Sequence, residues 1–228
     1  MAIDLELLDA AAHRTLRLSR SAQEMPHFTQ VVAAEFAAAA TRCPILLTKN
    51  AETGQFYAGA IYGFKQGENL LDGPQDPPPY RPLDLERQGF YISGDHIAID
   101  RDNPRFTENE GEPLFEADGS PSERLRYIQQ VLGRLKVGVE ETDAFIRALV
   151  QHRLVEPIDI SLRFDDGETL ALQGLYTVSL DNLRELEDAA ALQFFRSGYL
   201  QLCFCMIDSL KQVSALAHRR NRRLAMAG

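Results

Sequence analysis

The sequence has 228 residues, of which 45% are hydrophobic and 25% are charged, so it contains enough apolar material for one folded core. One compact domain is the expectation at this length. The formal net charge of −9 disfavours contact with phosphate backbones, so we expect no nucleic-acid partner. The three cysteines do not suit a disulfide framework and indicate a reducing compartment.

The N-terminal segment does not have the composition of a secretory signal, because Asp4, Glu6 and Asp9 interrupt it. The most apolar late segment, GYLQLCFCMIDSL, is interrupted by Gln201 and Asp208, whereas about 20 apolar residues are needed to span a bilayer. We therefore expect a cytoplasmic protein that does not span a membrane. Export to the cell surface by a C-terminal signal is an alternative that the sequence leaves open.

The segment before Pro44 has apolar residues at helical spacing from Phe28 to Ala39, which predicts a helix that ends at the proline. Two strands are predicted next, at 45–50 and 55–64, joined as a hairpin through Gly54. The stretch DGPQDPPPYRP contains five prolines and predicts irregular structure. Short strands at 89–94 and 96–100 and then a long loop are expected to follow.

Ser120 and Glu123 fit a capping box, which predicts that a helix begins at Ser120. Gly138 predicts a break, with a second helix from about Val139. The alternation in IDISLRF and the return in TLALQGLYTV predict a hairpin over 158–178. Helices are expected at 180–186, 188–196 and 199–219, the last of which would bury Cys203.

Strands and helices are segregated along the chain, which favours an α+β fold with antiparallel hairpins and a mainly helical C-terminal half. We expect a single compact domain at 25–218, an N-terminal extension at 1–24 and a basic tail at 219–228. The tail contains most of HRRNRR, which we interpret as solvated. The alternative interpretation is a patch that binds an anionic partner.

No glycine-rich phosphate loop, nucleophile elbow or paired-histidine metal motif occurs, and the five histidines are scattered singly. We therefore expect no catalytic residue, no cofactor and no metal site.

The four candidate ligand-binding residues are Glu68 and Asn69, which follow the strand at 55–64, and Tyr80 and Arg87, which flank PYRPLDLER. One interpretation is structural: the polar side chains satisfy backbone groups at a turn, and Arg87 pairs with Glu68 to hold the proline-rich loop. The other interpretation is a pocket for a polar small molecule or a peptide end. We favour the structural interpretation.

Several blocks of the sequence, taken in their order, resemble the SapC family of bacterial proteins. They include RCPILLTKN, GQFYAGAIYGFKQGENLL and PPYRPLDLERQGFYI, followed by GEPLFEADG, TDAFIRALVQHRLVEP, LQGLYTVSLDNLREL and SGYLQLCFCMIDSL. The chain differs from the family pattern in two respects: Cys43 stands where an aromatic residue usually precedes the proline, and the tryptophan that often follows G-E-N-L is absent.

The resemblance implies a link to bacterial surface-layer proteins, after which the family is named. It also implies neighbours that resemble TonB-dependent receptors, flavin-dependent halogenases and cupin-type oxygenases. It supplies no catalytic residue set. A peptide-transport permease shares the family's name but is unrelated.

Three functions are compatible with these observations. The first is a non-enzymatic binding or accessory protein that acts with surface-layer, uptake or modifying partners. The second is an enzyme, or a subunit of one, with a pocket around Glu68, Asn69, Tyr80 and Arg87. The third is a self-associating surface-array subunit. We favour the first, with a protein partner resembling an oxygenase, halogenase or receptor, and self-association into a homo-oligomer is compatible with it.

Overall fold

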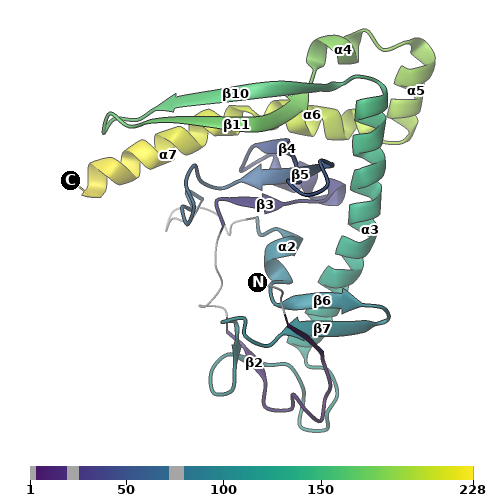
Figure 1. The fold of residues 1–228 in the computed structure, drawn as a ribbon, viewed down its shortest axis with the longest axis vertical. Helices are drawn as coiled ribbons and strands as arrows, with labels where there is room; N and C mark the ends of the chain where they lie inside the picture. Colours follow the sequence, from purple (N-terminus) through teal and green to yellow (C-terminus); the bar gives the residue numbers. More distant parts are fainter. Residues whose placement is uncertain (1–3, 20–25, 72–79, 228) are drawn as a thin grey trace. The chain divides into compact units, whose positions relative to one another are not determined.

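The computed structural model describes residues 4–19, 26–71 and 80–227. These residues form an α+β fold with antiparallel sheets and a helical C-terminal half, as the sequence predicts (Figure 1). The chain divides into two compact units, the first from Met1–Met25 and Leu83–Val137 and the second from Pro26–Pro82 and Gly138–Gly228. The predicted boundary between residues 24 and 25 lies outside the described residues.

The first unit contains two small antiparallel sheets. One has the order β1 (Leu5–Leu7), β7 (His96–Asp100), β6 (Phe90–Ser93), and the other has the order β8 (Phe106–Thr107), β2 (Arg17–Leu18), β9 (Glu112–Pro113). Parts of the predicted N-terminal extension, β1 and β2, are therefore strands of this unit. Its core consists of Leu16, Leu18, Phe90, Ile99, Phe106, Leu114, Phe115, Leu125, Ile128 and Leu132.

A short helix of the first unit, α2 (Leu83–Glu86), is stabilised at its C-terminal end by a buried arginine. The guanidinium of Arg105 donates hydrogen bonds to the carbonyl oxygens of Glu86 at 3.0 Å and Gln88 at 2.9 Å. Its side chain is 1% exposed. The cation thus satisfies carbonyl groups that a helix leaves unpaired at its end.

The second unit is built on a five-stranded sheet. Its order is β10 (Val155–Arg163), β11 (Thr169–Val178), β4 (Ile45–Lys49), β5 (Phe56–Ile61), β3 (Phe28–Gln30). The predicted hairpins 45–64 and 158–178 are confirmed as β4–β5 and β10–β11, and Ile45 of β4 pairs with Ala60 of β5.

The prediction of one helix between Phe28 and Ala39 is wrong in its first half. Phe28 lies in β3 and pairs with Ile61 at the edge of the sheet, and only η1 (Ala33–Glu35) and α1 (Phe36–Ala39) are helical. The ring of Phe28 covers Gly59, where an added Cβ would lie 2.0 Å from the ring. Pairing and packing on the neighbouring strand therefore override the helical spacing of the apolar residues.

The helix predicted to break at Gly138 is continuous, because α3 runs over Glu123–Gln151. Gly138 serves close packing, since a Cβ there would lie 2.7 Å from Cγ2 of Val32. The N-terminal cap also differs from the prediction: the hydroxyl of Ser122, not Ser120, accepts a hydrogen bond from the amide of Leu125 at 3.2 Å.

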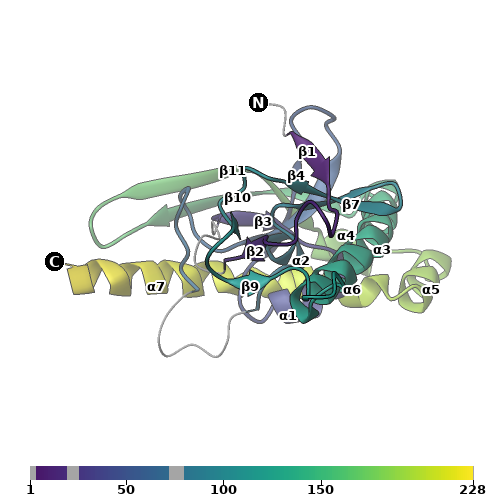
Figure 2. The same cartoon turned by 90° about the horizontal axis from the view of Figure 1, so that it is seen from below.

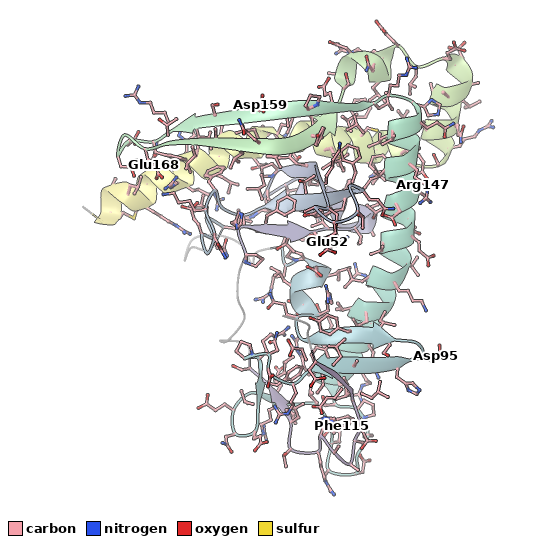
Figure 3. The ribbon with its side chains drawn as sticks, viewed as in Figure 1. Glu52, Asp95, Phe115, Arg147, Asp159 and Glu168 are labelled. Atoms are coloured by element: carbon pink, nitrogen blue, oxygen red, sulfur yellow. The ribbon has the colours of Figure 1, made fainter. Side chains whose placement is uncertain are left out.

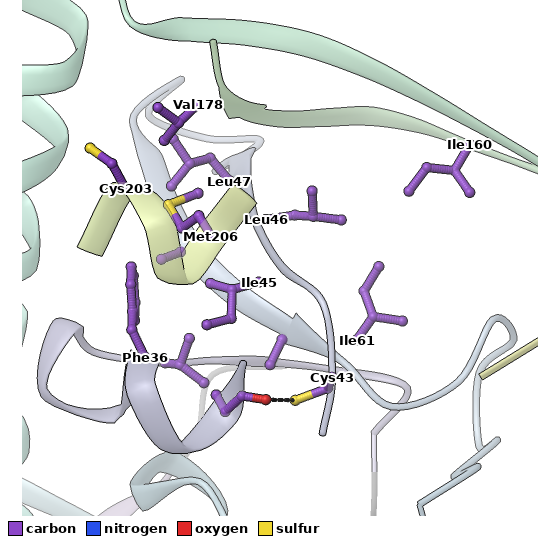
Figure 4. Close-up of a cluster of buried hydrophobic side chains, with 14 of the residues drawn as sticks. Phe36, Cys43, Ile45, Leu46, Leu47, Ile61, Ile160, Val178, Cys203 and Met206 are labelled. Atoms are coloured by element: carbon purple, nitrogen blue, oxygen red, sulfur yellow. Dashed lines mark hydrogen bonds between the residues drawn. The ribbon is translucent and has the colours of Figure 1, made fainter. Parts of the chain in front are cut away.

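Four helices complete the second unit: α4 (Leu180–Arg184), α5 (Asp188–Arg196), α6 (Tyr199–Ser209) and α7 (Lys211–Ala227). The helix predicted at 199–219 is divided at Leu210, and α7 continues past residue 219. In the core, Met206 and Cys203 of α6 lie with Leu47 of β4 and Phe36 of α1 (Figure 4).

None of the helices in the described residues is both long enough and apolar enough to cross a membrane.

Candidate functional site

Residues 62–71, which we call the anchored turn, follow β5 and fold back on it. The amide of Leu70 donates to the carbonyl of Tyr62 at 2.7 Å, which closes the turn. The turn is tight at Gly63, where an added Cβ would lie 2.1 Å from the carbonyl oxygen of Glu68. Gly67 has a φ of +77°, a conformation that favours glycine.

Glu68 is held at both of its carboxylate oxygens. Oε2 accepts a hydrogen bond from the amide of Phe64 at 2.7 Å, and Oε1 lies 3.2 Å from Nε of Arg220 on α7. The carboxylate therefore satisfies the backbone of its own turn and joins that turn to the C-terminal helix.

Arg220 is the centre of this cluster. Its Nη2 donates to Oε2 of Glu168 at 2.6 Å, and its guanidinium lies 4.0 Å from the ring centroid of Phe164. Glu168 stands at the turn between β10 and β11, beside α7 (Figure 3). The side chain of Arg220 is 8% exposed. Arg220 thus joins three segments, namely α7, the anchored turn and the β10–β11 turn.

A second cation supports Glu168. Nζ of Lys65 lies 2.5 Å from its Oε1. The hydrogen bond from Lys65, and after it the one from Arg220, lowers the pKa of the Glu168 carboxyl below its usual value of 4.5. The carboxylate is therefore charged at neutral pH and holds both cations.

Two more arginines of α7 bind main-chain oxygens of the same turn. Arg223 donates to the carbonyl of Asn69, and Arg219 donates to the carbonyl of Leu70 at 3.5 Å. The interpretation of HRRNRR as solvated is therefore wrong for Arg220, which is buried. It also missed the bonds that Arg219 and Arg223 make to the backbone of the anchored turn. The sequence signal for these contacts was the spacing of Arg219, Arg220 and Arg223, which lie close together on one side of a helix.

Asn69 caps its own turn. Its side-chain oxygen accepts a hydrogen bond from the amide of Leu71 at 2.9 Å, the local pattern expected of asparagine at a turn. With the contacts of Glu68, this bears out the structural interpretation of the two adjacent polar residues.

Tyr80 belongs to a different cluster of the second unit. Its hydroxyl donates to Oε1 of Glu35 at 2.7 Å, and Oε2 of Glu35 accepts from the amide of Val32 at 3.1 Å. Burial, and then the Glu35 carboxylate, raises the pKa of Tyr80 above its usual value. Burial also raises the pKa of the nearby Cys43 thiol to about 12, so this cysteine stays protonated at neutral pH and is a poor nucleophile.

Arg87 belongs to the first unit. Its Nε and Nη2 donate to Oδ1 of Asp84 at 2.9 and 2.5 Å, and its guanidinium lies 5.2 Å from the ring centroid of Tyr91. Together with Gln88 and Asn103 these residues line a cavity of about 220 Å³.

The expected pair between Glu68 and Arg87 is wrong, because Glu68 pairs with Arg220 and Arg87 pairs with Asp84. The prediction placed the two residues together across the proline-rich segment, whereas that segment leads from the second unit to the first. Binding of a ligand by Glu68, Asn69, Tyr80 or Arg87 stays a prediction. In the described ranges, no three His, Cys, Asp or Glu side chains gather as metal ligands.

Sequence reasoning missed a surface of a different kind. Leu192 and Phe195 on α5 and Phe204 on α6 are 47%, 70% and 48% exposed. We call these three side chains the apolar face. α5 also carries Phe194, which is buried at 1% exposure, so adjacent aromatic residues on one helix serve the core and the surface. Helical spacing alone indicates that α5 is amphipathic but does not indicate that Phe195 lies outside the core.

A hollow of about 780 Å³ lies on another side of α5. Its lining includes His152 at the end of α3, Asn182 of α4, and Ala190 and Gln193 of α5. The amide of Asn182 donates to the carbonyl of Arg153 at 2.8 Å, which ties α4 to the end of α3. The region around α5 therefore offers an exposed apolar surface and a shaped depression on the same unit.

A family model described as SapC matches residues 8–216. Neither the curated proteins nor the solved structures give a match.

Proposed function

The chain belongs to the SapC family, and from this membership together with its apolar face we propose that it is a non-enzymatic binding protein that acts as an accessory to a protein partner. The observation that carries the proposal is the exposure of Phe195, which is 70%, on α5 beside the exposed Leu192, with Phe204 exposed on the next helix, α6. Large aromatic side chains contribute most to binding when a partner covers them.

Fully burying an exposed large apolar side chain contributes about 1.5–3 kcal/mol. The three side chains are 47–70% exposed, so covering them would offset part of the cost of association, and further contacts with the partner would supply the rest. Exposed apolar residues that stand singly need no explanation, but three on consecutive helices form a candidate interface. The partner class that we propose is the one that the family resemblance implies: a surface-layer, TonB-dependent uptake, oxygenase or halogenase protein.

Affinity capture from the native host tests this function. The tagged wild-type chain is compared with Phe195→Glu and with Val150→Glu, a control that places the same charge on an apolar side chain of α3 that is 49% exposed. We expect wild type and the control to retain a partner of the proposed class and Phe195→Glu to lose it by at least about tenfold. Equal recovery of that partner by all three would contradict the use of this face.

A further inference from the structure

We propose that the outer edge of β10 pairs with the same edge of a second copy of this chain, in an antiparallel twofold arrangement centred on Ser161. β10 is the end strand of the five-stranded sheet, and within the described residues it pairs only with β11. Figures 1 and 2 show the two strands as a long hairpin, and in Figure 1 β10 follows the rim of the second unit. An end strand of 9 residues offers a row of backbone groups to which another strand can be added.

The register of the hairpin determines which backbone groups of β10 face outward. The amide of Phe164 donates to the carbonyl of Glu168 at 2.9 Å, so the backbone of Phe164 points toward β11. The pairing continues in this register through Leu162 and Ile160. Because backbone groups alternate in direction along an antiparallel strand, the residues between these positions direct their N–H and C=O away from β11. The outward residues are Asp159, Ser161 and Arg163, and all three are exposed.

The charges of these outward residues are complementary to one another. A twofold antiparallel pairing centred on Ser161 places this residue opposite Ser161 of the second copy and Asp159 opposite Arg163 of the second copy, twice by symmetry. Neither charged side chain makes an ion pair within the part of the chain that the structure describes. Opposite residues of this kind exchange two backbone hydrogen bonds, and opposite charges across two strands stabilise their pairing.

The apolar face of β10 fits the same register. Ile160 is buried in the core of the second unit, and Ile158 and Leu162, on the same face, are partly buried against it. In the proposed register Ile160 lies opposite Leu162 of the second copy. Apolar residues therefore meet on one face of the junction while opposite charges meet on the other.

Two neighbouring registers lack this match. A pairing centred on Asp159 would bring two aspartates together and would set Ser161 against Pro157, which has no N–H to donate. A pairing centred on Leu162 would place Asp159 opposite Asp165 of the second copy. Repulsion between carboxylates therefore favours the centre at Ser161 over both.

Charges and prolines on an end strand also occur as protection against edge pairing. In β10, Pro157 limits the outward row at one end, but the two charges that flank Ser161 have opposite sign. An extended segment of another protein is the competing occupant of the edge. Such a segment would have to bring its own matching charges, whereas a second copy supplies them by symmetry, so self-complementarity favours the second copy.

Sedimentation velocity of the full chain over a range of protein concentrations tests the proposal. We expect a reversible, concentration-dependent dimer. Ser161→Pro removes the outward N–H at the centre of the pairing but no hydrogen bond to β11, so the dimer should weaken by at least about tenfold. Pro157 already occupies an outward position of the same strand, so the variant should keep its fold, which circular dichroism checks.

Exchange of the two charges provides the sharper test. Asp159→Arg or Arg163→Asp alone would place like charges opposite each other and should weaken the dimer several-fold, whereas the two changes on one chain should restore it. Glu52→Arg makes the same change of charge in the exposed turn between β4 and β5 and should leave the dimer unchanged. A chain that stays monomeric at every concentration, or a double variant no better than either single variant, would overturn the pairing.

The pairing uses the edge of β10 and not the apolar face, so it goes beyond the proposed function. Phe195→Glu should therefore leave the dimer unchanged, and loss of the dimer in this variant would overturn β10 as the interface. Partner capture is measured separately, so either inference can fail while the other stands.

Discussion

The anchored turn and the apolar face belong to the same unit but differ in what their side chains contact: those of the turn are bonded within the fold, whereas those of the apolar face are exposed. In the anchored turn, the polar side chains of Glu68 and Asn69 bond to backbone and to α7, so groups that could have formed a binding site stabilise the fold instead. In the apolar face, Phe195 is exposed although its residue type is typical of a core. The comparison teaches that the partners of a side chain, not its chemical type, identify the surface left for function.

Among the contacts of the anchored turn, Arg220 should give the largest effect. We expect Arg220→Met to lower the free energy of unfolding by about 2–3 kcal/mol, because it leaves two carboxylates without their shared cation. The loss is smaller than for a fully buried pair, since Glu68 and Glu168 are 20% and 30% exposed. Urea unfolding at pH 7 measures it.

Arg222→Met is the matched control on the same helix, because Arg222 is exposed. Its change in the free energy of unfolding should stay within about 0.5 kcal/mol. Equal losses for the two variants would show that Arg220 has no special role.

Gly63→Ala should destabilise the anchored turn by about 2 kcal/mol, because the new methyl group would overlap the carbonyl oxygen of Glu68 and the backbone would have to move. Gly67→Ala meets no neighbouring atom and suffers only from its positive φ, so we expect a loss of about 1 kcal/mol. Thermal unfolding of both variants compares them. A larger loss of stability for Gly67→Ala than for Gly63→Ala would mean that the backbone at Gly63 moves easily to accommodate a methyl group.

The Glu168 carboxylate should make a smaller, pH-dependent contribution. Its pKa is lower in the folded chain than the usual 4.5, so its pairing stabilises the fold above that value and the contribution is lost as pH falls through the folded pKa. The difference in free energy of unfolding between wild type and Glu168→Gln should therefore be largest near neutral pH and shrink in acid. A difference that is constant from pH 7 to pH 3 would contradict the ion pairs.

Phe195→Ser should have the smallest effect on stability, within about 0.5 kcal/mol, because the side chain is 70% exposed. Phe194→Ser, one residue earlier and 1% exposed, should cost about 3–5 kcal/mol through lost burial and a cavity. Chemical denaturation of the two variants gives the comparison. A large loss for Phe195→Ser would mean that this ring packs within the fold and is not available to a partner.

The local sequence pattern was sufficient to predict those elements that pair with segments near to them in the sequence. The strict alternation of 158–164 and its return after Gly167 predicted the hairpin that β10 and β11 form, because neighbouring strands of a hairpin need only a turn between them. The same holds for β4 and β5, and for the α+β class as a whole. The asparagine cap at residue 69 was also predictable, since its acceptor reaches an amide two residues away.

Contacts between distant segments were beyond the sequence by itself. The helical spacing after Phe28 did not reveal that this residue would pair with β5 and cover Gly59, and Gly138 looked like a break until Val32 was found against it. Glu68 was assigned to Arg87, 19 positions away, whereas its partner Arg220 lies 152 positions along the chain. The sequence by itself determined the class, the hairpins and the family resemblance, because these depend on local periodicity and motif order. Only the tertiary structure decided which arginine is buried and which phenylalanine is exposed, because burial depends on what the rest of the chain places beside each residue.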